Sequence, residues 1–237
     1  MFPDQMNEHN TIIFSTSNDS SYAIEAISRL ELARDKSHNC TVALIGSSFS
    51  NTTKIIAKTK NVKLVEVGSE HYPIQWDYPR ECYYWTLAPD IFKNYKYAIY
   101  IDGDVYCRKE PFINLQSYPL NSLAGITLKI NPGITDREIS IYSNEYSFNL
   151  NTPRINSGVL YMNLEYLRKN NFTNKIKKLY EWSIRNNIPR KGDDSLLWVF
   201  VKTHDWNWTY LPIEYNWIYT LFGEPTQDVV WYHANKK

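Results

Sequence analysis

The sequence predicts an α/β fold in which helices flank a mixed, mostly parallel central sheet. Two observations carry this prediction. From Thr11 to Val67, apolar strands alternate with helical patterns in the order β-α-β-α-β, as in parallel strands joined by crossover helices. The run Tyr97–Ile101 indicates another buried strand, because it is rich in β-branched and aromatic residues. The chain has 237 residues, no linker or repeat divides it, and we expect one domain.

The elements follow from local patterns in chain order. Apolar runs predict strands at Thr11–Ser15, Thr41–Ile45, Val62–Val67, Tyr97–Ile101, Ser122–Leu128, Arg154–Met162 and Val229–His233. Helical spacing predicts helices at 22–33, Asn51–Lys60, Glu81–Phe92, Leu164–Lys169, Phe172–Asn187 and Ser195–Val201. The long polar stretch Asn131–Pro153 contains Gly and Pro, and loops of this length are often binding loops.

Composition narrows the class of protein. The net charge of +1 gives no indication of a general nucleic-acid or membrane partner. The three cysteines, Cys40, Cys82 and Cys107, are scattered, which is typical of reduced thiols rather than a disulfide framework. The first residues are polar, and no apolar run reaches the roughly 18 residues of a membrane span. We therefore expect a cytoplasmic protein.

The most informative motif is Asp102-Gly103-Asp104, which directly follows the strand Tyr97–Ile101. Residues i and i+2 of an extended chain point to the same side, so the two carboxylates can converge. Two converging anions repel each other unless a cation lies between them, and Mg²⁺ and Mn²⁺ prefer such oxygen ligands. The alternative is a polar turn at the strand end, since Asp and Gly are common turn residues.

Six further motifs accompany the acidic one in order along the chain. They are SNDSSYA (17–23), CYYWTL (82–87), INSGVLYMN (155–163), GDDSLL (192–197), LPIEYN (211–216) and VVWYH (229–233). Together, from about Thr11 to His233, they resemble glycosyltransferase family 8, and in particular its glycogenin-like members. The resemblance implies the GT-A fold, a Rossmann-like fold of nucleotide-sugar transferases. It also implies a nucleotide- and metal-binding half (about 1–128) and a donor-sugar and acceptor half (about 129–237).

The resemblance implies a nucleotide site at the first loop. Thr16, Ser17 and Asp19 would hold the nucleotide, and Tyr22 would stack on uracil; the alternative for Tyr22 is an aromatic residue of the core. Arg80 is the nearest candidate for the diphosphate, because a guanidinium is a bidentate fork, or else it is a solvated surface residue. Lys236 or Lys237 takes the place of the lysine with which the family binds the diphosphate, or the sequence is a domain of a longer protein.

For the metal, the resemblance implies Mn²⁺ or Mg²⁺ bound by Asp102, Asp104 and His233. Asp104 would be the stronger ligand, Asp102 would bridge the metal and the ribose, and Gly103 would be among the residues that bind the nucleotide-sugar. His233 would be the third ligand, because it follows the terminal strand as the family's metal-binding histidine does.

For the sugar, the resemblance implies that Asn156 and Ser157 hydrogen-bond the donor hexose, while Gly158 lets the backbone approach the ligand. Asp193 would contact hydroxyl groups near the anomeric carbon. Asp194 stands where relatives have Gln, and it could hydrogen-bond the sugar, stabilise an oxocarbenium-like transition state or attack C1. The alternative is that Asp193 and Asp194 only cap a helix.

These residues predict a metal-dependent transferase of the EC 2.4 class that moves glucose or galactose from a UDP-sugar with retention of configuration. The acceptor would be a hydroxyl group of a glycan, glycoprotein or other molecule. One alternative is a nucleotidyltransferase that makes sugar nucleotides, but such enzymes usually carry a Gly-rich basic loop, and 16–22 contains neither Gly nor Lys. Another is a non-catalytic carbohydrate-binding protein, suggested only by the 15% of aromatic residues.

Overall fold

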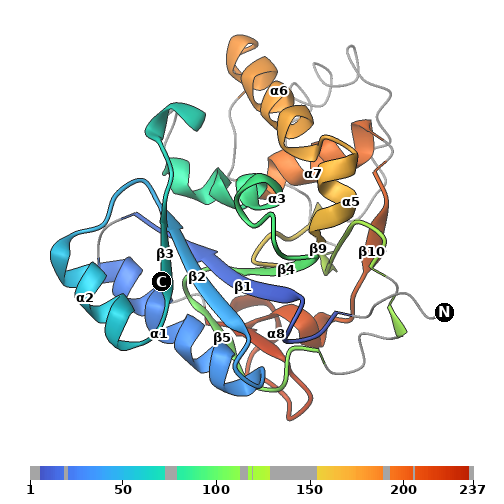
Figure 1. Cartoon of the computed structure of the whole chain (residues 1–237). Helices are drawn as coiled ribbons and strands as arrows, with labels where there is room; N and C mark the ends of the chain where they lie inside the picture. Colours follow the sequence, from blue (N-terminus) through green and yellow to red (C-terminus); the bar gives the residue numbers. More distant parts are fainter. Residues whose placement is uncertain are drawn as a thin grey trace.

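The computed structural model describes residues 6–18, 21–72, 79–112, 117–118, 120–128, 154–188, 193–204 and 206–234. Within them, a seven-stranded sheet forms the centre of the molecule (Figure 1). Its strands are β1 (Thr11–Thr16), β2 (Thr41–Gly46), β3 (Lys63–Glu66), β4 (Tyr97–Ile101), β6 (Leu123–Gly125), β9 (Val159–Asn163) and β10 (Trp208–Tyr210). Their spatial order is β10-β6-β9-β4-β1-β2-β3. Strand β9 is antiparallel to both of its neighbours and the other pairs are parallel, which confirms the predicted mixed, mostly parallel sheet.

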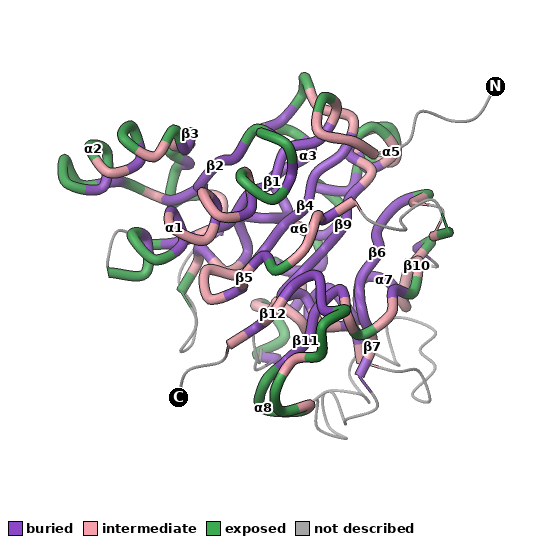
Figure 2. The backbone as a smooth tube through the Cα atoms, turned by 90° about the horizontal axis from the view of Figure 1, so that it is seen from below, coloured by how far each residue is buried: buried purple, intermediate pink, exposed green. Residues whose placement is uncertain are grey.

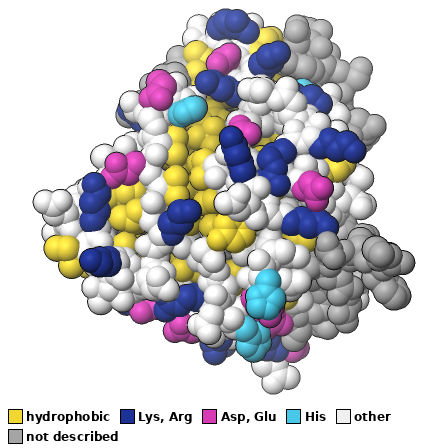
Figure 3. All heavy atoms as spheres, viewed as in Figure 1, with side chains coloured by type: hydrophobic (Ala, Val, Ile, Leu, Met, Phe, Trp, Pro, Cys, Tyr) yellow, Lys and Arg dark blue, Asp and Glu magenta, His cyan; other side chains and the backbone are white. Residues whose placement is uncertain are grey.

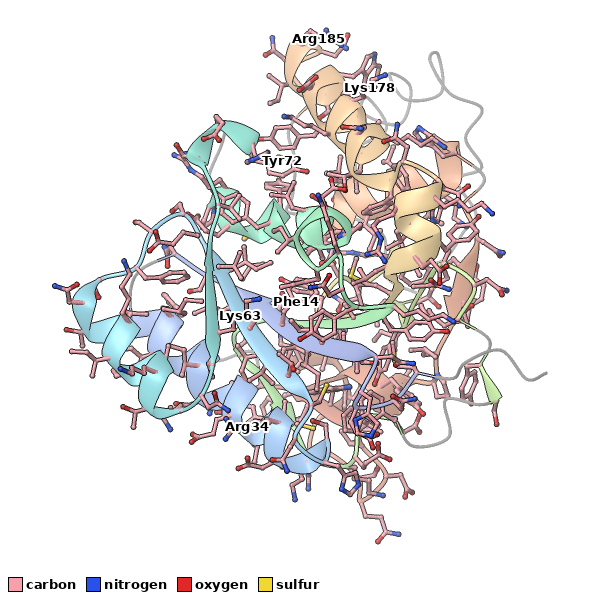
Figure 4. All side chains as sticks on the ribbon, in the orientation of Figure 1. Phe14, Arg34, Lys63, Tyr72, Lys178 and Arg185 are labelled. Atoms are coloured by element: carbon pink, nitrogen blue, oxygen red, sulfur yellow. The ribbon has the colours of Figure 1, made fainter. Side chains whose placement is uncertain are left out.

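Helices cover both faces of this sheet (Figure 1). The helices α1 (Ser21–Lys36) and α2 (Asn51–Thr59) lie on one face. The other face carries α3 (Ala88–Ile91), α5 (Leu164–Lys169), α6 (Phe172–Arg185) and α7 (Asp193–Thr203). Lys178 and Arg185 lie on the outer side of α6, away from the sheet (Figure 4). The chain is therefore a three-layer α/β/α structure.

Strand alternation explains why both faces need a cover. In β1, Ile12 and Phe14 belong to the core under α3 and α5–α7, whereas Ile13 belongs to the core under α1. All three side chains are fully buried, as parallel strands between two helix layers require. Phe14 packs edge-on against Phe92, with ring centroids 5.2 Å apart (Figure 4). The buried strands lie together at the centre of the molecule (Figure 2).

A second, smaller sheet lies beside the first. It consists of β11 (Trp217–Ile218), β12 (Trp231–His233) and β5 (Val105–Cys107). The 3-10 helix η4 (Ile213–Asn216) precedes β11, and the short helix α8 (Tyr219–Phe222) follows it. Because β5 follows β4 after the turn at Asp102–Asp104, this small sheet brings the C-terminal strand next to the end of the central sheet.

Three predicted elements differ in detail. Ser122–Leu128 is broken at Ile126 into β6 and β7 (Thr127–Leu128), and the predicted strand Arg154–Met162 is broken into β8 (Arg154–Ile155) and β9. The reason is that β7 and β8 leave the central sheet and pair with each other. The predicted helix Glu81–Phe92 is the 3-10 helix η2 (Arg80–Leu87) followed by α3, which begins anew at Ala88 with Pro89 in its first turn.

The outer surface carries both hydrophobic and charged side chains. On the face shown in Figure 3, hydrophobic side chains gather in the middle and Lys and Arg side chains surround them.

Tyr72 follows the 3-10 helix η1 (Ser69–His71) and packs against Tyr180 of α6, with ring centroids 4.8 Å apart (Figure 4). None of the helices in the described part of the chain has the length and apolar character needed to span a membrane.

Candidate active site

The turn Asp102-Gly103-Asp104 connects the end of β4 with β5. The strand before it is fully buried, and its hydrogen bonding continues into the turn, because the Asp102 amide donates to the carbonyl of Gly158 (2.9 Å). The Tyr100 hydroxyl donates to Oδ1 of Asp102 (2.6 Å). The Asp102 side chain is therefore held at the carboxyl edge of the central sheet, where open α/β sheets bind ligands.

The small sheet brings His233 to the same place. His233 pairs with Val105 across the β5–β12 ladder, directly after the acidic turn. Its Nε2 lies 2.9 Å from Oδ1 of Asp104 and 3.8 Å from Oδ2 of Asp102. The three candidate ligand atoms lie within 4.8 Å of one another. The expected metal triad is thus assembled, although 129 residues (233 minus 104) separate Asp104 from His233.

The electrostatics of this triad suit a cation. Partial burial raises the pKa of Asp102, opposed by the charge of His233. For Asp104, burial also raises the pKa, but the hydrogen bond and charge of His233 outweigh it and the net pKa is lowered. Burial lowers the pKa of His233, but the hydrogen bond that it donates to Asp104 and the charge of Asp102 outweigh this effect, and the net pKa is raised. Protonated His233 therefore compensates the two carboxylates, a task that a bound divalent cation would take over.

The backbone at Gly158 fixes the His233 ring. A Cβ atom at this position would lie 2.8 Å from both Cε1 and Nδ1 of His233. Glycine is therefore required by the packing of the histidine ring, whereas we expected it to allow a close approach of the ligand. Nδ1 of His233 is buried and has no hydrogen-bond partner in the described structure, so Nε2, which faces the two carboxylates, is the available ligand atom.

Asp193 begins α7 and faces the same region. The indole Nε1 of Trp85 donates to its Oδ2 (2.7 Å). Burial raises the pKa of Asp193 well above its ordinary value, and the charges of Asp194 and Asp102 raise it further. Three carboxylates thus influence one another in this site, which is a costly arrangement of the kind found at functional sites.

Asp194 is held by a ring of donors. Its Oδ1 accepts from the amide and the hydroxyl of Ser157 (2.5 Å each). Its Oδ2 accepts from the Arg154 guanidinium (2.9 Å) and from Nδ2 of Asn156 (3.4 Å). The side-chain oxygen of Asn156 in turn accepts from the Gly158 amide (3.0 Å) and from Nδ2 of Asn216 (2.6 Å). Asn156 and Ser157, which we expected to bind the hexose, therefore support Asp194 in this structure.

The predicted nucleotide residues lie at the carboxyl end of β1 where the structure describes them. Strand β1 pairs in parallel with β4, with Phe14 opposite Tyr100, so Thr16 is level with Asp102. Ser17 is buried, and its hydroxyl donates to the carbonyl of Asn18 (2.9 Å). Tyr22 is 69% exposed at the start of α1, which rules out the alternative of a core aromatic.

Of the remaining predicted residues, the structure describes Arg80 and Gly103, whereas the others lie outside the described part. Arg80 begins η2, and its guanidinium donates to the carbonyl of Ser69 (3.0 Å), which ties η2 to η1. A Cβ at Gly103 would make only an ordinary contact of 3.6 Å with Ala26, so no steric reason demands glycine there. Asp19, Lys236, Lys237 and the stretch Asn131–Pro153 lie outside the described residues.

Sequence reasoning missed four residues of the site. Tyr100 could have been found, because it lies two residues before Asp102 and therefore on the same side of the strand. Arg154 and Asn216 carry no local signal, since their partners Asp194 and Asn156 are 40 and 60 residues away. Trp85 carries no local signal either, since its bond to Asp193 spans 108 residues.

Comparisons with known proteins agree with this architecture. Residues 30–235 match the family model described as glycosyl transferase family 8. The galactosyltransferase LgtC, in a crystal structure with donor and acceptor sugar analogues, is similar with a TM-score of 0.70 and 16% identity over 95% of this chain and 87% of LgtC. Mouse xyloside xylosyltransferase 1 is similar with a TM-score of 0.63 and 13% identity over 95% of this chain and 97% of that protein. No curated protein sequence matches the chain. The fold is GT-A.

Proposed function

Since the chain belongs to glycosyl transferase family 8 and is a glycosyltransferase, we propose that it is metal-dependent and uses a UDP-hexose as donor. Glucose or galactose would move to a hydroxyl group of a glycan, a glycoprotein or another acceptor, with retention of anomeric configuration. The observation that carries the proposal is the convergence of Asp102, Asp104 and His233.

The donor set fits Mn²⁺ or Mg²⁺. Two carboxylates and one imidazole nitrogen match what these hard and borderline cations accept, and Asp102, Asp104 and His233 would hold the ion. When bound, such an ion neutralises the charge that develops on the departing diphosphate. Tyr100 keeps Asp102 oriented through its hydrogen bond, and Gly158 leaves room for the His233 ring.

The nucleotide would lie along the carboxyl ends of β1 and β4. Thr16, Ser17 and Asp19 would hold the uridine, Tyr22 would stack on the base, and Arg80 and Lys236 would contact the diphosphate. The exposed ring of Tyr22 supports this role, since a stacking residue must be accessible. Gly103 would lie beside the ribose, together with Asp102.

The donor hexose would lie between the metal triad and the start of α7. Asp193 is the carboxylate best suited to hydroxyl groups of the sugar, because it begins α7 and Trp85 orients it through a hydrogen bond to Oδ2. Asn156, Ser157 and Asp194 form the wall beside it through their mutual hydrogen bonds. The net charge of +1 gives no indication of a nucleic-acid acceptor.

A titration and a donor panel test the proposal together. Binding of UDP is measured by calorimetry with and without Mn²⁺, and hydrolysis of UDP-glucose, UDP-galactose and other UDP-sugars is followed by release of UDP. We expect Mn²⁺ to promote UDP binding and one UDP-hexose to be hydrolysed fastest. A folded protein that binds UDP equally well with and without Mn²⁺, or that hydrolyses no UDP-hexose, contradicts the proposal.

A further inference from the structure

The carboxylate of Asp194 has all its acceptor positions occupied by the protein itself. An ionised carboxylate offers about four lone-pair sites. Ser157 fills two of them through its amide and hydroxyl, and Arg154 and Asn156 fill the other two. The Arg154 and Asp194 side chains are only 24% and 16% exposed. These four donors lower the nucleophilicity of the carboxylate and fix its position.

We propose that Arg154 and Asp194 form a positioning pair that holds the segment Asn156–Gly158 in place for the metal ligands. Asp194 thus acts as an anchor and not as the nucleophile, and Arg154 supplies the charge that makes this anchor stable. The inference rests on the proposed function for its reaction, but the pair itself can be tested without any donor.

The segment that Asp194 holds borders two of the three metal ligands. The carbonyl of Gly158 accepts from the amide of Asp102 (2.9 Å). The Cα of the same glycine lies against the ring of His233, where a Cβ would be 2.8 Å from two ring atoms. Because Ser157 and Asn156 are bonded to Asp194, a shift of Asp194 moves the backbone that supports both Asp102 and His233.

Charge explains why the two residues act as a unit. Removal of one partner from a mostly buried ion pair leaves the other charge without compensation, which costs far more than removal of both. An amide at position 194 would also direct an NH₂ group at the guanidinium of Arg154, so donors would face donors. Replacement of both residues by amides restores a neutral, complementary pair.

This difference separates a positioning role from a nucleophilic one. The variants are Asp194→Asn, Arg154→Gln and the double variant, with Glu66→Gln as the matched control. Glu66 forms an ion pair of the same length with Lys54 (2.9 Å), but both of these side chains are about half exposed (51% and 48%). For each variant, calorimetry gives the Mn²⁺ affinity, UDP-hexose hydrolysis gives kcat and KM, and urea unfolding gives the stability.

We expect each single variant to bind Mn²⁺ about tenfold more weakly, as for other groups that orient metal ligands. The double variant should recover to within about threefold of the parent protein, and its loss of stability should be smaller than the sum of the single losses. In the double variant, turnover should recover together with the Mn²⁺ affinity. Glu66→Gln should change neither the Mn²⁺ affinity, nor turnover, nor stability. A double variant that binds Mn²⁺ no better than the weaker single variant overturns the proposal, and so do strictly additive stability losses.

The outcomes also distinguish this inference from the proposed function. If Asp194 attacks the sugar, kcat collapses in Asp194→Asn and stays lost in the double variant, while KM and Mn²⁺ affinity change little. If the parent protein binds Mn²⁺ but hydrolyses no UDP-hexose, the proposed function fails, and the Mn²⁺ affinities still decide the role of the pair. If the parent protein binds no Mn²⁺, the link to the metal ligands is wrong.

Discussion

The indole of Trp85 and the carboxylate of Asp193 are joined by a hydrogen bond of 2.7 Å across 108 residues of sequence. Trp85 is fully buried and packs near Tyr100 and Phe172, with ring centroids 6.1 Å from each. This hydrogen bond connects the core of the protein to the candidate active site. Burial raises the pKa of the Asp193 carboxylate, and the charges of Asp194 and Asp102 raise it further.

Trp85→Phe should weaken both stability and turnover. The change removes the donor to Asp193 and leaves a small cavity, so the free energy of unfolding should fall by about 2–4 kcal/mol. With its carboxylate no longer oriented, kcat should fall by about tenfold or more. Urea unfolding and UDP-sugar hydrolysis measure the two effects. Trp206→Phe is the control, because its indole donates to Ser122 in the same core and Trp206 follows the C-terminal end of α7, whereas Asp193 begins that helix. A similar loss of kcat in both variants contradicts the special role of Trp85.

Local sequence patterns were sufficient to predict the position of the acidic turn. The apolar run Tyr97–Ile101 predicts a strand that ends at Asp102, and the structure has that strand with those bounds. The convergence of His233 was implied by the resemblance to glycosyltransferase family 8, because no local pattern links it to Asp104. Strand pairing explains why His233 lies beside Asp104, since β12 pairs with β5 immediately after the turn.

The supporting contacts could not be predicted in the same way. Nothing near Arg154 indicates that its partner is Asp194, because the pairing depends on how β8 and the start of α7 meet in space. The break of the predicted strand Ser122–Leu128 at Ile126 also depends on contacts with a distant segment. Residues 122–128 and 154–162 each look like one continuous strand, and only the pairing of β7 with β8 draws part of each away from the central sheet. Contacts between distant elements decide these features.

Gly158→Ala should disturb the metal site specifically. The added methyl group would lie 2.8 Å from two atoms of the His233 ring, so the ring or the backbone must move. We expect a loss of about 1–3 kcal/mol in stability and at least about a tenfold loss in Mn²⁺ affinity. Gly125→Ala is the matched control, since the nearest atoms to its new methyl group belong to Trp208 (3.1 Å) and Val159 (3.2 Å), outside the metal triad. Equal Mn²⁺ affinities in the two variants would show that Gly158 does not position His233.

Asp104→Asn should abolish transfer while the protein stays folded. The substitution removes one ligand charge and the strongest partner of His233, whose Nε2 lies 2.9 Å away. We expect Mn²⁺ affinity and kcat to fall by about 100-fold or more. Asp228→Asn is the control, because this aspartate is paired with Lys109 at the surface and is 71% exposed. Circular dichroism checks the fold, and unchanged turnover in Asp104→Asn would refute the metal assignment.

Asp193→Asn should make the metal-free protein more stable at neutral pH. The folded pKa of Asp193 is raised above the unfolded value of about 3.9, so the protonated form is favoured by folding. The stabilisation from this group is present below the unfolded pKa and is lost as the pH rises through the folded pKa. An amide carries no such penalty, and its oxygen can still accept from Trp85.

The advantage of Asp193→Asn should therefore grow with pH and disappear in acid. Each unit of raised pKa corresponds to about 1.4 kcal/mol at a pH above both values. Urea unfolding in the presence of EDTA, repeated from acidic to neutral pH, measures the difference between the variant and the parent protein. The variant should also lose transfer, because Asp193 is the carboxylate assigned to the sugar, so stability and activity should change in opposite directions. A stability difference that is the same at every pH, or that favours the parent protein at neutral pH, would show that Asp193 is not held at an electrostatic cost.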